Sequence, residues 1–420
     1  MVTIQKPVMK KTILLVAGTL ITKGIFAQIN SQQLGGQTIN PITTAVPFLL
    51  ISPDSKQGGM GDVGVATDPD VNSVHWNGSK LAFADKQFGV GFTVTPWLRL
   101  LVPDINLYYL AGYAKINKNQ AIATSLRYFS LGNIELTNAT GVKTGDFKPN
   151  EFAVDIAFSQ KLSKNFSLGI ATRYINSSIS RVYFNGSSGN AASTYAVDLT
   201  TYYRSDKFKL GEKNATASAG LAFTNIGAKI KYSNDQNFIP MNMRLGGGLK
   251  TEIDDYNTIG FYLDFNKLLV PTPPIYKYKI DPVTGEQTAE IEIDPATGKK
   301  VIEKGKDPNV PVTQGILQSF GDAPGGFKEE MEEFNTSVGL EYWYNNVFAV
   351  RTGYFYEPKT KGSRQFFTVG MGVKYSVVNI DGSFLIPTLL NNPLQRTWRI
   401  SLSFDFDPAK KEKDPTAIQP

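Results

Sequence analysis

The chain has 420 residues, with 43 Lys and Arg against 37 Asp and Glu and a formal net charge of +6. It contains no Cys and a single His, which excludes disulfide scaffolds and thiolate metal sites and argues against Cys-His or Ser-His-Asp catalysis. Four of the lysines lie in residues 1–27, so the remainder has a net charge of only about +2. Nucleic-acid binding, which requires a marked basic excess, is therefore excluded.

Residues 1–27 have the layout of a secretory signal peptide. Lys10 and Lys11 precede an apolar stretch from Ile13 to Phe26, and Ala27 supplies a small residue at the cleavage position. No later apolar run reaches the ~18 residues of a membrane helix. An exported chain of this kind is either a soluble periplasmic β protein or an outer-membrane barrel.

The segment 28–87 is predicted to be an irregular plug, or hatch. Three prolines between residues 41 and 53 exclude long regular elements. Gly59, Gly61 and Gly64 match G-x-G-x-x-G, but neither the preceding strand nor the following helix of a dinucleotide fold accompanies them. Close packing of backbone inside a confined lumen explains these glycines better.

Residues that could carry chemistry are sparse in this segment. His75 stands beside Trp76 in a Gly-rich stretch, where a packed or hydrogen-bonded role is favoured over catalysis. Asp68 and Asp70 lack the further oxygen ligands of a calcium loop. No pair of carboxylates stands out for glycoside hydrolysis. We therefore predict a protein that is not an enzyme and has no cofactor and no metal.

From Phe88 onward the residues alternate with a period of two. In the last such segment, Trp398 to Phe406, one parity is wholly apolar and the other carries Arg, Ser and Asp. The polar parity throughout is rich in Gly, Ala, Ser and Thr, which suits a crowded lumen, while the apolar parity suits lipid. The predicted fold is therefore all-β, a 14-stranded antiparallel transmembrane barrel with an N-terminal hatch in its lumen. The predicted strands are 88–95, 105–116, 120–130, 151–161, 165–179, 193–204, 214–226, 240–250, 257–267, 334–344, 347–357, 364–375, 377–386 and 397–406.

An even strand number places both ends of the barrel, 88–406, on the same side, which in bacterial barrels is the periplasm. Tight turns on that side, such as Lys118-Asn119 and Asn345-Asn346, contrast with long connections on the other. The polar tail 407–420 is expected to extend into the periplasm, so both mature termini are predicted there.

The longest connection, 268–333, is predicted to be a functional external loop. Two Asp-Pro-x-Thr-Gly turns, at 281–285 and 294–298, flank an alternating run and predict a small hairpin. Ile316 to Phe320 and Phe327 to Glu333 are predicted to form short helices.

The hatch segment also carries a family resemblance. Gly59-Met60-Gly61, Ala66-Thr67-Asp68 and Trp76-Asn77, followed by Leu81-Ala82-Phe83, resemble the plug of long-chain fatty-acid transporter (FadL-type) barrels. That superfamily usually has Trp-Asn-Pro, whereas this chain has Trp76-Asn77-Gly78. The string from Gly58 to Ala66, the strand layout and the large late loop more closely resemble the PorV (LptO) family of type IX secretion.

The resemblance implies an outer-membrane adaptor rather than a pore. Such proteins associate with a giant translocon barrel and accept cargo by binding the C-terminal domain of the cargo protein. They then pass the cargo to a sortase-like attachment complex on the cell surface. The alternative is a FadL-type transporter of hydrophobic small molecules. The residues that the resemblance assigns to the hatch are Gly59, Met60, Gly61, Asp62, Gly64, Asp68, His75, Trp76 and Asn77.

Apolar residues in the predicted external loops are candidates for partner contact. Trp97, Leu98, Leu100, Leu101 and Val102 form an apolar run in the first external loop. The same run could instead dip into the headgroups of outer-membrane lipid. The further candidates in the longest loop are Pro273, Ile275, Tyr276, Phe320 and Phe327.

Overall fold

The computed structural model describes residues 39–138, 140–179, 183–184, 187–188, 191–232, 236–389 and 392–407. The expected signal peptide, the first part of the hatch segment and nearly all of the C-terminal tail lie outside these residues. Residues from Asn40 onward belong to one compact unit, and only this unit is described below.

Fourteen antiparallel strands close into a barrel because the first strand pairs with the last. Phe88 lies opposite Phe406 in this pairing, and the register continues to Val94 opposite Ile400. Both ends of the barrel wall are therefore at one end of the cylinder, together with the short turns. The wall strands are β1 (Phe88–Pro96), β2 (Asn106–Lys115), β3 (Gln120–Ser130), β6 (Asn150–Lys161), β7 (Phe166–Ser177), β10 (Ala192–Arg204), β12 (Lys213–Gly227), β15 (Asn242–Glu252), β16 (Asn257–Leu268), β21 (Phe334–Tyr344), β22 (Phe348–Tyr356), β23 (Gln365–Tyr375), β24 (Val378–Pro387) and β25 (Trp398–Phe406).

The predicted fold class is confirmed, and each of the fourteen predicted strands matches a wall strand to within two residues at either end. The period of two explains this agreement, because one side chain in two must face outward along every strand of a closed barrel. A β-bulge between β10 and β12, at Val197 and Leu199, is the one irregularity in the described wall pairings.

The outer surface of the wall is apolar and the inner surface is polar. A soluble sandwich would bury its apolar parity, so the exposure of that parity identifies a lipid-facing barrel. In the part of the chain that the structure describes, no helix has the length and apolar character needed to cross a membrane. The outward-facing apolar side chains include Val90, Phe92, Leu110, Ile122, Leu126, Ile156, Leu199, Leu245, Phe261, Val350, Val369, Met371, Ile400 and Leu402.

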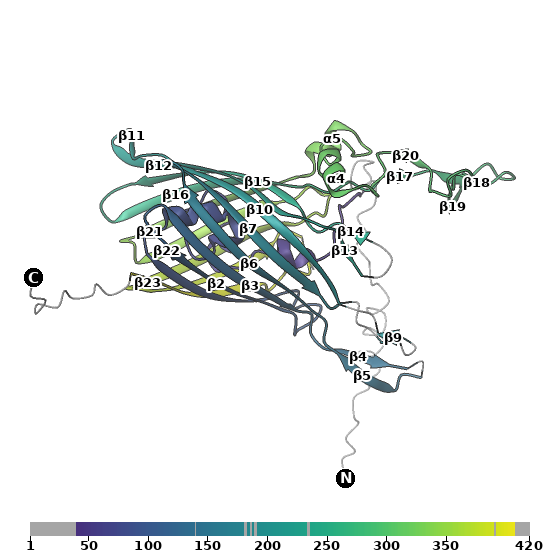
Figure 1. Cartoon of the computed structure of the whole chain (residues 1–420), viewed down its shortest axis with the longest axis horizontal. Coiled ribbons are helices and arrows are strands. Elements are labelled where there is room, and N and C mark those ends of the chain that lie inside the picture. The colour runs from purple at the N-terminus through teal and green to yellow at the C-terminus, as the bar shows by residue number, and fades with distance from the viewer. Residues whose placement is uncertain are drawn as a thin grey trace, which may run out of the picture. The chain divides into compact units, whose positions relative to one another are not determined.

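The hatch lies inside the barrel (Figure 1) and is made of short turns of helix. These are η1 (Pro47–Leu50), α2 (Ser55–Gly58), α3 (Ser73–Trp76) and η2 (Gly78–Phe83). Asp54 caps α2 by accepting a hydrogen bond from the amide of Gln57 (2.9 Å), and the side chain of Asn77 caps η2 by accepting from the amide of Ser79 (3.2 Å). Each element is a single turn or little more, so packing against the wall rather than helix propensity holds it in place.

The connections at the other end of the barrel are long and carry their own structure. The region between β16 and β21 contains the small hairpin β18 (Tyr278–Ile280) and β19 (Gln287–Ile291), β17 (Ile275–Tyr276) paired with β20 (Ile302–Lys304), and helices α4 (Val312–Gln318) and α5 (Phe327–Met331). Both predicted turns form, with Gly285 and Gly298 at positive φ. The remaining short strands are β4 (Ile134–Thr137), β5 (Lys143–Phe147), β8 (Tyr183–Phe184), β9 (Ser187–Ser188), β11 (Phe208–Leu210), β13 (Ile230–Lys231) and β14 (Gln236–Asn237).

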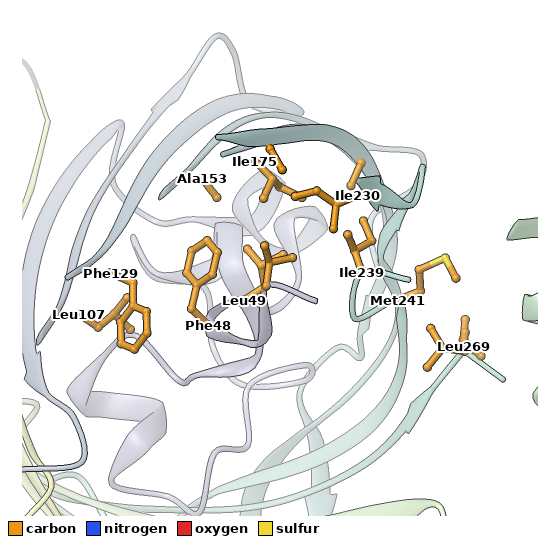
Figure 2. Close-up of a cluster of buried hydrophobic side chains, with 14 of the residues drawn as sticks. Phe48, Leu49, Leu107, Phe129, Ala153, Ile175, Ile230, Ile239, Met241 and Leu269 are labelled. Atoms are coloured by element: carbon orange, nitrogen blue, oxygen red, sulfur yellow. The ribbon is translucent and has the colours of Figure 1, made fainter. Parts of the chain in front are cut away.

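An apolar cluster lies in the lumen near the long-loop end. Figure 2 shows Phe48 and Leu49 of η1 among side chains from the wall and from the connections between its strands, with Phe129 of β3 close to Phe48. The rings of Phe48 and Phe129 stack with centroids 6.1 Å apart. This cluster fixes the position at which the chain enters the barrel.

Candidate functional site

The glycines of the hatch allow its backbone to touch the wall. Gly61 has φ +70°, and a Cβ atom there would lie 2.6 Å from the backbone nitrogen of Tyr354. On the wall, a Cβ atom at Gly353 would lie 2.1 Å from the carbonyl carbon of Met60. Such distances are possible only between two glycine-bearing segments. In the structure, glycine at position 61 therefore permits close packing of the hatch on the wall.

Wall side chains bind the hatch backbone from several directions. Asp264 of β16 accepts hydrogen bonds from the amides of Gly64 (2.7 Å) and Val65 (3.0 Å). Thr368 of β23 accepts from the amide of Gly61 (2.7 Å). These amides are buried, so the wall must satisfy them wherever the hatch has no regular structure of its own.

Arg127 of β3 holds the opposite side of the hatch. Its Nη1 donates to the carbonyl oxygen of Leu49 (2.8 Å), and its Nη2 lies 2.8 Å from Nδ1 of His75. A guanidinium is always a donor, so Nδ1 of His75 must be the acceptor and the imidazole is neutral. His75, the only histidine of the sequence, is thus buried and hydrogen-bonded to Arg127.

Asn77 and Trp76 also have structural roles. Asn77 donates to the carbonyl oxygens of Val65 (3.0 Å) within the hatch and Thr201 (2.9 Å) on β10. Trp76 donates from Nε1 to the buried carboxylate of Asp54 (2.7 Å). The structure therefore places the predicted Trp76-Asn77 pair at the centre of the hatch, where it fastens the segment both to itself and to the wall.

A cavity of about 610 Å³ lies between the hatch and the long-loop end of the wall. Its sides are largely apolar, with Phe48 from the hatch and Phe129 and Phe366 from the wall. Its polar lining includes Asp62 and Trp76 of the hatch. The volume is in the range of small-molecule sites, ~300–1,000 Å³.

The region 269–333, called here the long loop, is fastened to the barrel by a buried charge cluster. Glu333 forms ion pairs with Lys267 at the end of β16 and with Lys361 (3.0 Å), and it accepts a hydrogen bond from Oγ1 of Thr272 (2.6 Å). Lys361 also pairs with Glu329 of α5 (2.6 Å). All but Glu329 are buried, so the cluster locks α5 against the barrel rim.

The connection between α4 and α5 is tied into the same cluster. Glu330 accepts hydrogen bonds from the amides of Asp322 (2.7 Å) and Ala323 (2.8 Å), and it pairs with Lys267 (3.3 Å). Asp322 accepts in turn from the amide of Thr272 (3.1 Å). Burial raises the pKa of Asp322 to about 6, and the neighbouring Glu333 and Glu330 add to the effect.

The structure separates the predicted partner residues of the first external loop into two groups. Trp97 and Leu98 turn inward, line the cavity and pack on its apolar clusters. Leu100, Leu101 and Val102 are exposed. The apolar run predicted as one surface is therefore divided between the lumen and the outside of the protein.

The predicted partner residues of the long loop are divided in a similar way. Pro273, Ile275 and Tyr276 are half-buried. Phe320 and Phe327 are exposed. The predicted run and the predicted loop residues are therefore not brought together into a single surface by the described contacts.

Inward-facing arginines that contact the hatch or line the lumen were not identified from the sequence. Arg127, Arg244 and Arg399 occur on the polar parity of their strands, for which the sequence analysis predicts only a crowded lumen. The signal that could have identified them is an arginine on the lumen-facing parity of a strand, because its long side chain reaches the hatch. No metal-binding group of three or more His, Asp or Glu occurs in the described ranges.

The fold and the site together define a class: a plugged, fourteen-stranded outer-membrane barrel whose hatch is fastened to the wall. The family model described as "Type IX secretion system protein PorV" matches residues 34–275. The chain belongs to this PorV family. No match was found among the curated proteins.

The solved structures that this chain is similar to include two toluene transporters and a FadL homologue. The Ralstonia pickettii toluene transporter TbuX has a TM-score of 0.45 at 10% identity, covering 84% of this chain and 98% of its own. The P. putida toluene transporter TodX has a TM-score of 0.44 at 12% identity, covering 85% and 99%. A Pseudomonas aeruginosa FadL homologue has a TM-score of 0.38 at 12% identity, covering 87% and 99%.

Proposed function

We propose that this protein is an outer-membrane adaptor of the type IX secretion system. In this role it binds secreted cargo by the cargo's C-terminal domain at the giant translocon barrel and delivers it to the sortase-like attachment complex on the cell surface. The long loops then face outward and both mature termini face the periplasm. Membership of the PorV family supports the secretion role.

The fastening of the hatch supports an adaptor rather than a conduit. Asp264, Thr368 and Arg127 hold the hatch from three separate strands, through hydrogen bonds that are buried. Releasing the hatch would leave those groups without partners, at about 1–3 kcal/mol for each. A folded protein cannot pass through such a lumen, so cargo would have to be held outside it.

The observation that carries the proposal is the exposed apolar surface on the long loop. Leu317 of α4 is 77% exposed and Phe327 of α5 is 78% exposed, with Phe320 and Met331 also exposed beside them in sequence. Phe327 and Met331 are four residues apart and therefore share one face of α5. Large apolar side chains held in place outside the membrane-facing wall are typical of protein-binding surfaces.

The test is co-purification in mild detergent of the double variant Leu317→Ser/Phe327→Ser. We expect the translocon barrel and cargo to co-purify with the wild type. With the double variant, the recovered amount of at least one of these two partners should fall at least tenfold, and cargo should accumulate in the periplasm. Val283→Ser is the matched control, because Val283 is 91% exposed at the tip of the β18–β19 hairpin. Unchanged partner recovery and normal secretion by the double variant would refute the assignment of this surface.

The cavity favours one second candidate, a FadL-type transporter of hydrophobic small molecules. Gene deletion separates the two functions. Cargo retained in the periplasm with intact uptake of hydrophobic compounds supports the adaptor, whereas normal secretion with lost uptake supports the transporter.

A further inference from the structure

Three basic side chains gather around one phenylalanine of the hatch at the short-turn end of the barrel. Nζ of Lys161 lies 4.3 Å from the centroid of the Phe83 ring, and Cζ of Arg204 lies 5.1 Å from it. Nζ of Lys115 donates to the carbonyl oxygen of Ala84, the next residue of the hatch (2.7 Å). Each cation is the last residue of its wall strand, β2, β6 or β10, and each points inward to the hatch. The three are called here the mouth cluster.

The mouth cluster has no carboxylate partner among the described residues. Asp85, which follows directly in the hatch segment, is exposed and forms no ion pair with the cluster in the part of the chain that the structure describes. Asp206, beside the end of β10, pairs instead with Lys164 (2.7 Å). Elsewhere near this end of the wall, Lys250 meets the hatch carboxylate of Asp68 (2.6 Å). The hatch therefore neutralises a wall cation on one side of the mouth but not on the side of the cluster.

The unpaired charges of the mouth cluster favour binding of an anion. Contact with the Phe83 ring attracts each cation but leaves its charge in place. Like charges gathered at one site repel one another, and a bound anion relieves that repulsion. All three basic residues are half-buried, whereas Phe83 beneath them is 3% exposed. A ligand can therefore reach the cations from the short-turn end without displacing the hatch.

The spacing of the strands indicates what kind of anion fits. β2, β6 and β10 are separated by β3 and β7, so their ends follow one another at ~10 Å along the rim. One phosphate or one carboxylate cannot span that distance. A polypeptide in the polyproline II conformation with an acid at every third residue presents its carboxylates on one face, ~9 Å apart. The cluster therefore matches a row of carboxylates better than a single anion.

Two other sources of negative charge fit less well. Phospholipid headgroups lie outside the wall, whereas the mouth cluster faces the lumen. The chain's own segment 408–420 holds three lysines against two acids, so it has no acidic excess to offer. The remaining source is an acidic segment of another protein.

We propose that the mouth cluster binds an acidic segment of a periplasmic protein, laid in an extended conformation across the short-turn end of the barrel. The segment rests on Phe83 and does not enter the lumen, because the hatch stays in place beneath it. A partner held there leaves the long loops at the opposite end free. That this partner is periplasmic rests on the proposed orientation of the barrel; the binding itself does not.

The test is binding of a labelled peptide, Glu-Pro-Pro-Glu-Pro-Pro-Glu, to the purified full-length protein in a neutral detergent, followed by fluorescence anisotropy. We expect this peptide to bind at least tenfold more tightly than the same peptide with Gln in place of Glu. The affinity should fall as the salt concentration rises. Because the assay uses the isolated barrel, its outcome is independent of whether the protein acts in secretion. Equal binding of the two peptides, or no binding of either, would overturn the proposal.

Competition separates a polypeptide from a phosphate group. Neither inorganic phosphate nor phosphatidylglycerol micelles, at a matched concentration of negative charge, should displace the Glu peptide. Displacement by either competitor would assign the cluster to a phosphate or a lipid headgroup and would refute the polypeptide.

Single variants connect the binding to the cluster. Lys161→Gln should weaken binding of the Glu peptide at least fivefold, and Lys161→Arg, which retains the charge, should restore it. Lys374→Gln is the matched control: Lys374 also lies near the short-turn end of its strand, but on β23, the twelfth wall strand, nearly opposite β6, the fourth. Unchanged binding in Lys161→Gln, or an equal loss in Lys374→Gln, would contradict the assignment of the site.

Discussion

The hatch and the long loop are both anchored to the barrel, but by different chemistry. The hatch is held by many hydrogen bonds from separate strands to its backbone, and by glycines that allow contact at van der Waals distance. The long loop is held by the charge cluster centred on Glu333 and by Val312 and Ile316 of α4, which pack on the apolar lumen cluster. Its helices α4 and α5 still leave apolar side chains exposed.

This difference predicts two kinds of response to mutation. Distributed contacts with the wall make the hatch part of the barrel's cooperative unit, so a change there should affect the stability of the whole. Anchors confined to the rim make the loop a separate unit that can open while the barrel stays intact. A surface that binds and releases partners is therefore better placed on the long loop than on the hatch.

The largest expected effect is on the loop. Glu333→Gln removes the negative charge that Lys267 and Lys361 share in a buried site. The free energy needed to open the long loop should therefore fall by about 3 kcal/mol. Hydrogen exchange of the α5 amides should accelerate about a hundredfold, with an unchanged unfolding midpoint of the barrel. Glu290→Gln, which removes an exposed ion pair with Lys279 in the same loop, should leave exchange unchanged. If the unfolding midpoint of the barrel fell together with the protection of the α5 amides, the barrel and the long loop would be one cooperative unit.

Gly353→Ala is expected to have a smaller effect, but one that lowers the stability of the whole barrel. The added methyl group would meet the backbone of Met60 and Gly61, which must then shift, at about 1–3 kcal/mol. Denaturant unfolding in detergent should move to lower concentration, and protease should gain access to the hatch. Gly382→Ala is the control, since a Cβ atom on that wall glycine would have nothing within 4 Å. If both variants unfold alike, close contact between hatch and wall does not contribute to stability.

The smallest expected effect is a dependence of loop opening on pH. The pKa of Asp322 is raised to about 6 in the folded loop, above its value in the unfolded chain, so the folded form binds the proton more tightly. This residue therefore favours the closed loop at low pH, and its contribution is lost as the pH rises through about 6. Asp322→Asn should flatten the change in α5 exchange between pH 5 and 7 relative to wild type. An identical slope in the variant would assign the pH dependence to other groups.

Much of the barrel could be predicted from residue patterns, because strand parity and turn chemistry are local. The Asp-Pro-x-Thr-Gly turns and the alternation of Phe88 to Val94 depend on neighbours within a few residues. The inward turn of Trp97 and Leu98 could not be predicted, since an apolar run beside a membrane can pack inward, contact a partner or enter lipid. Only the presence of the apolar lumen clusters beneath it decided the outcome.

By itself the sequence determined a lipid-facing barrel of fourteen strands, the end at which its long loops lie, and a glycine-rich hatch, because each follows from periodicities and turns within short segments. The tertiary structure alone decided which charges neutralise one another. Arg399 meets Asp62, and Glu333 meets Lys361, only after the barrel closes and the hatch enters it. The same long-range packing brings Asp264 of β16 to the amides of Gly64 and Val65, and no local pattern in the sequence predicts that contact.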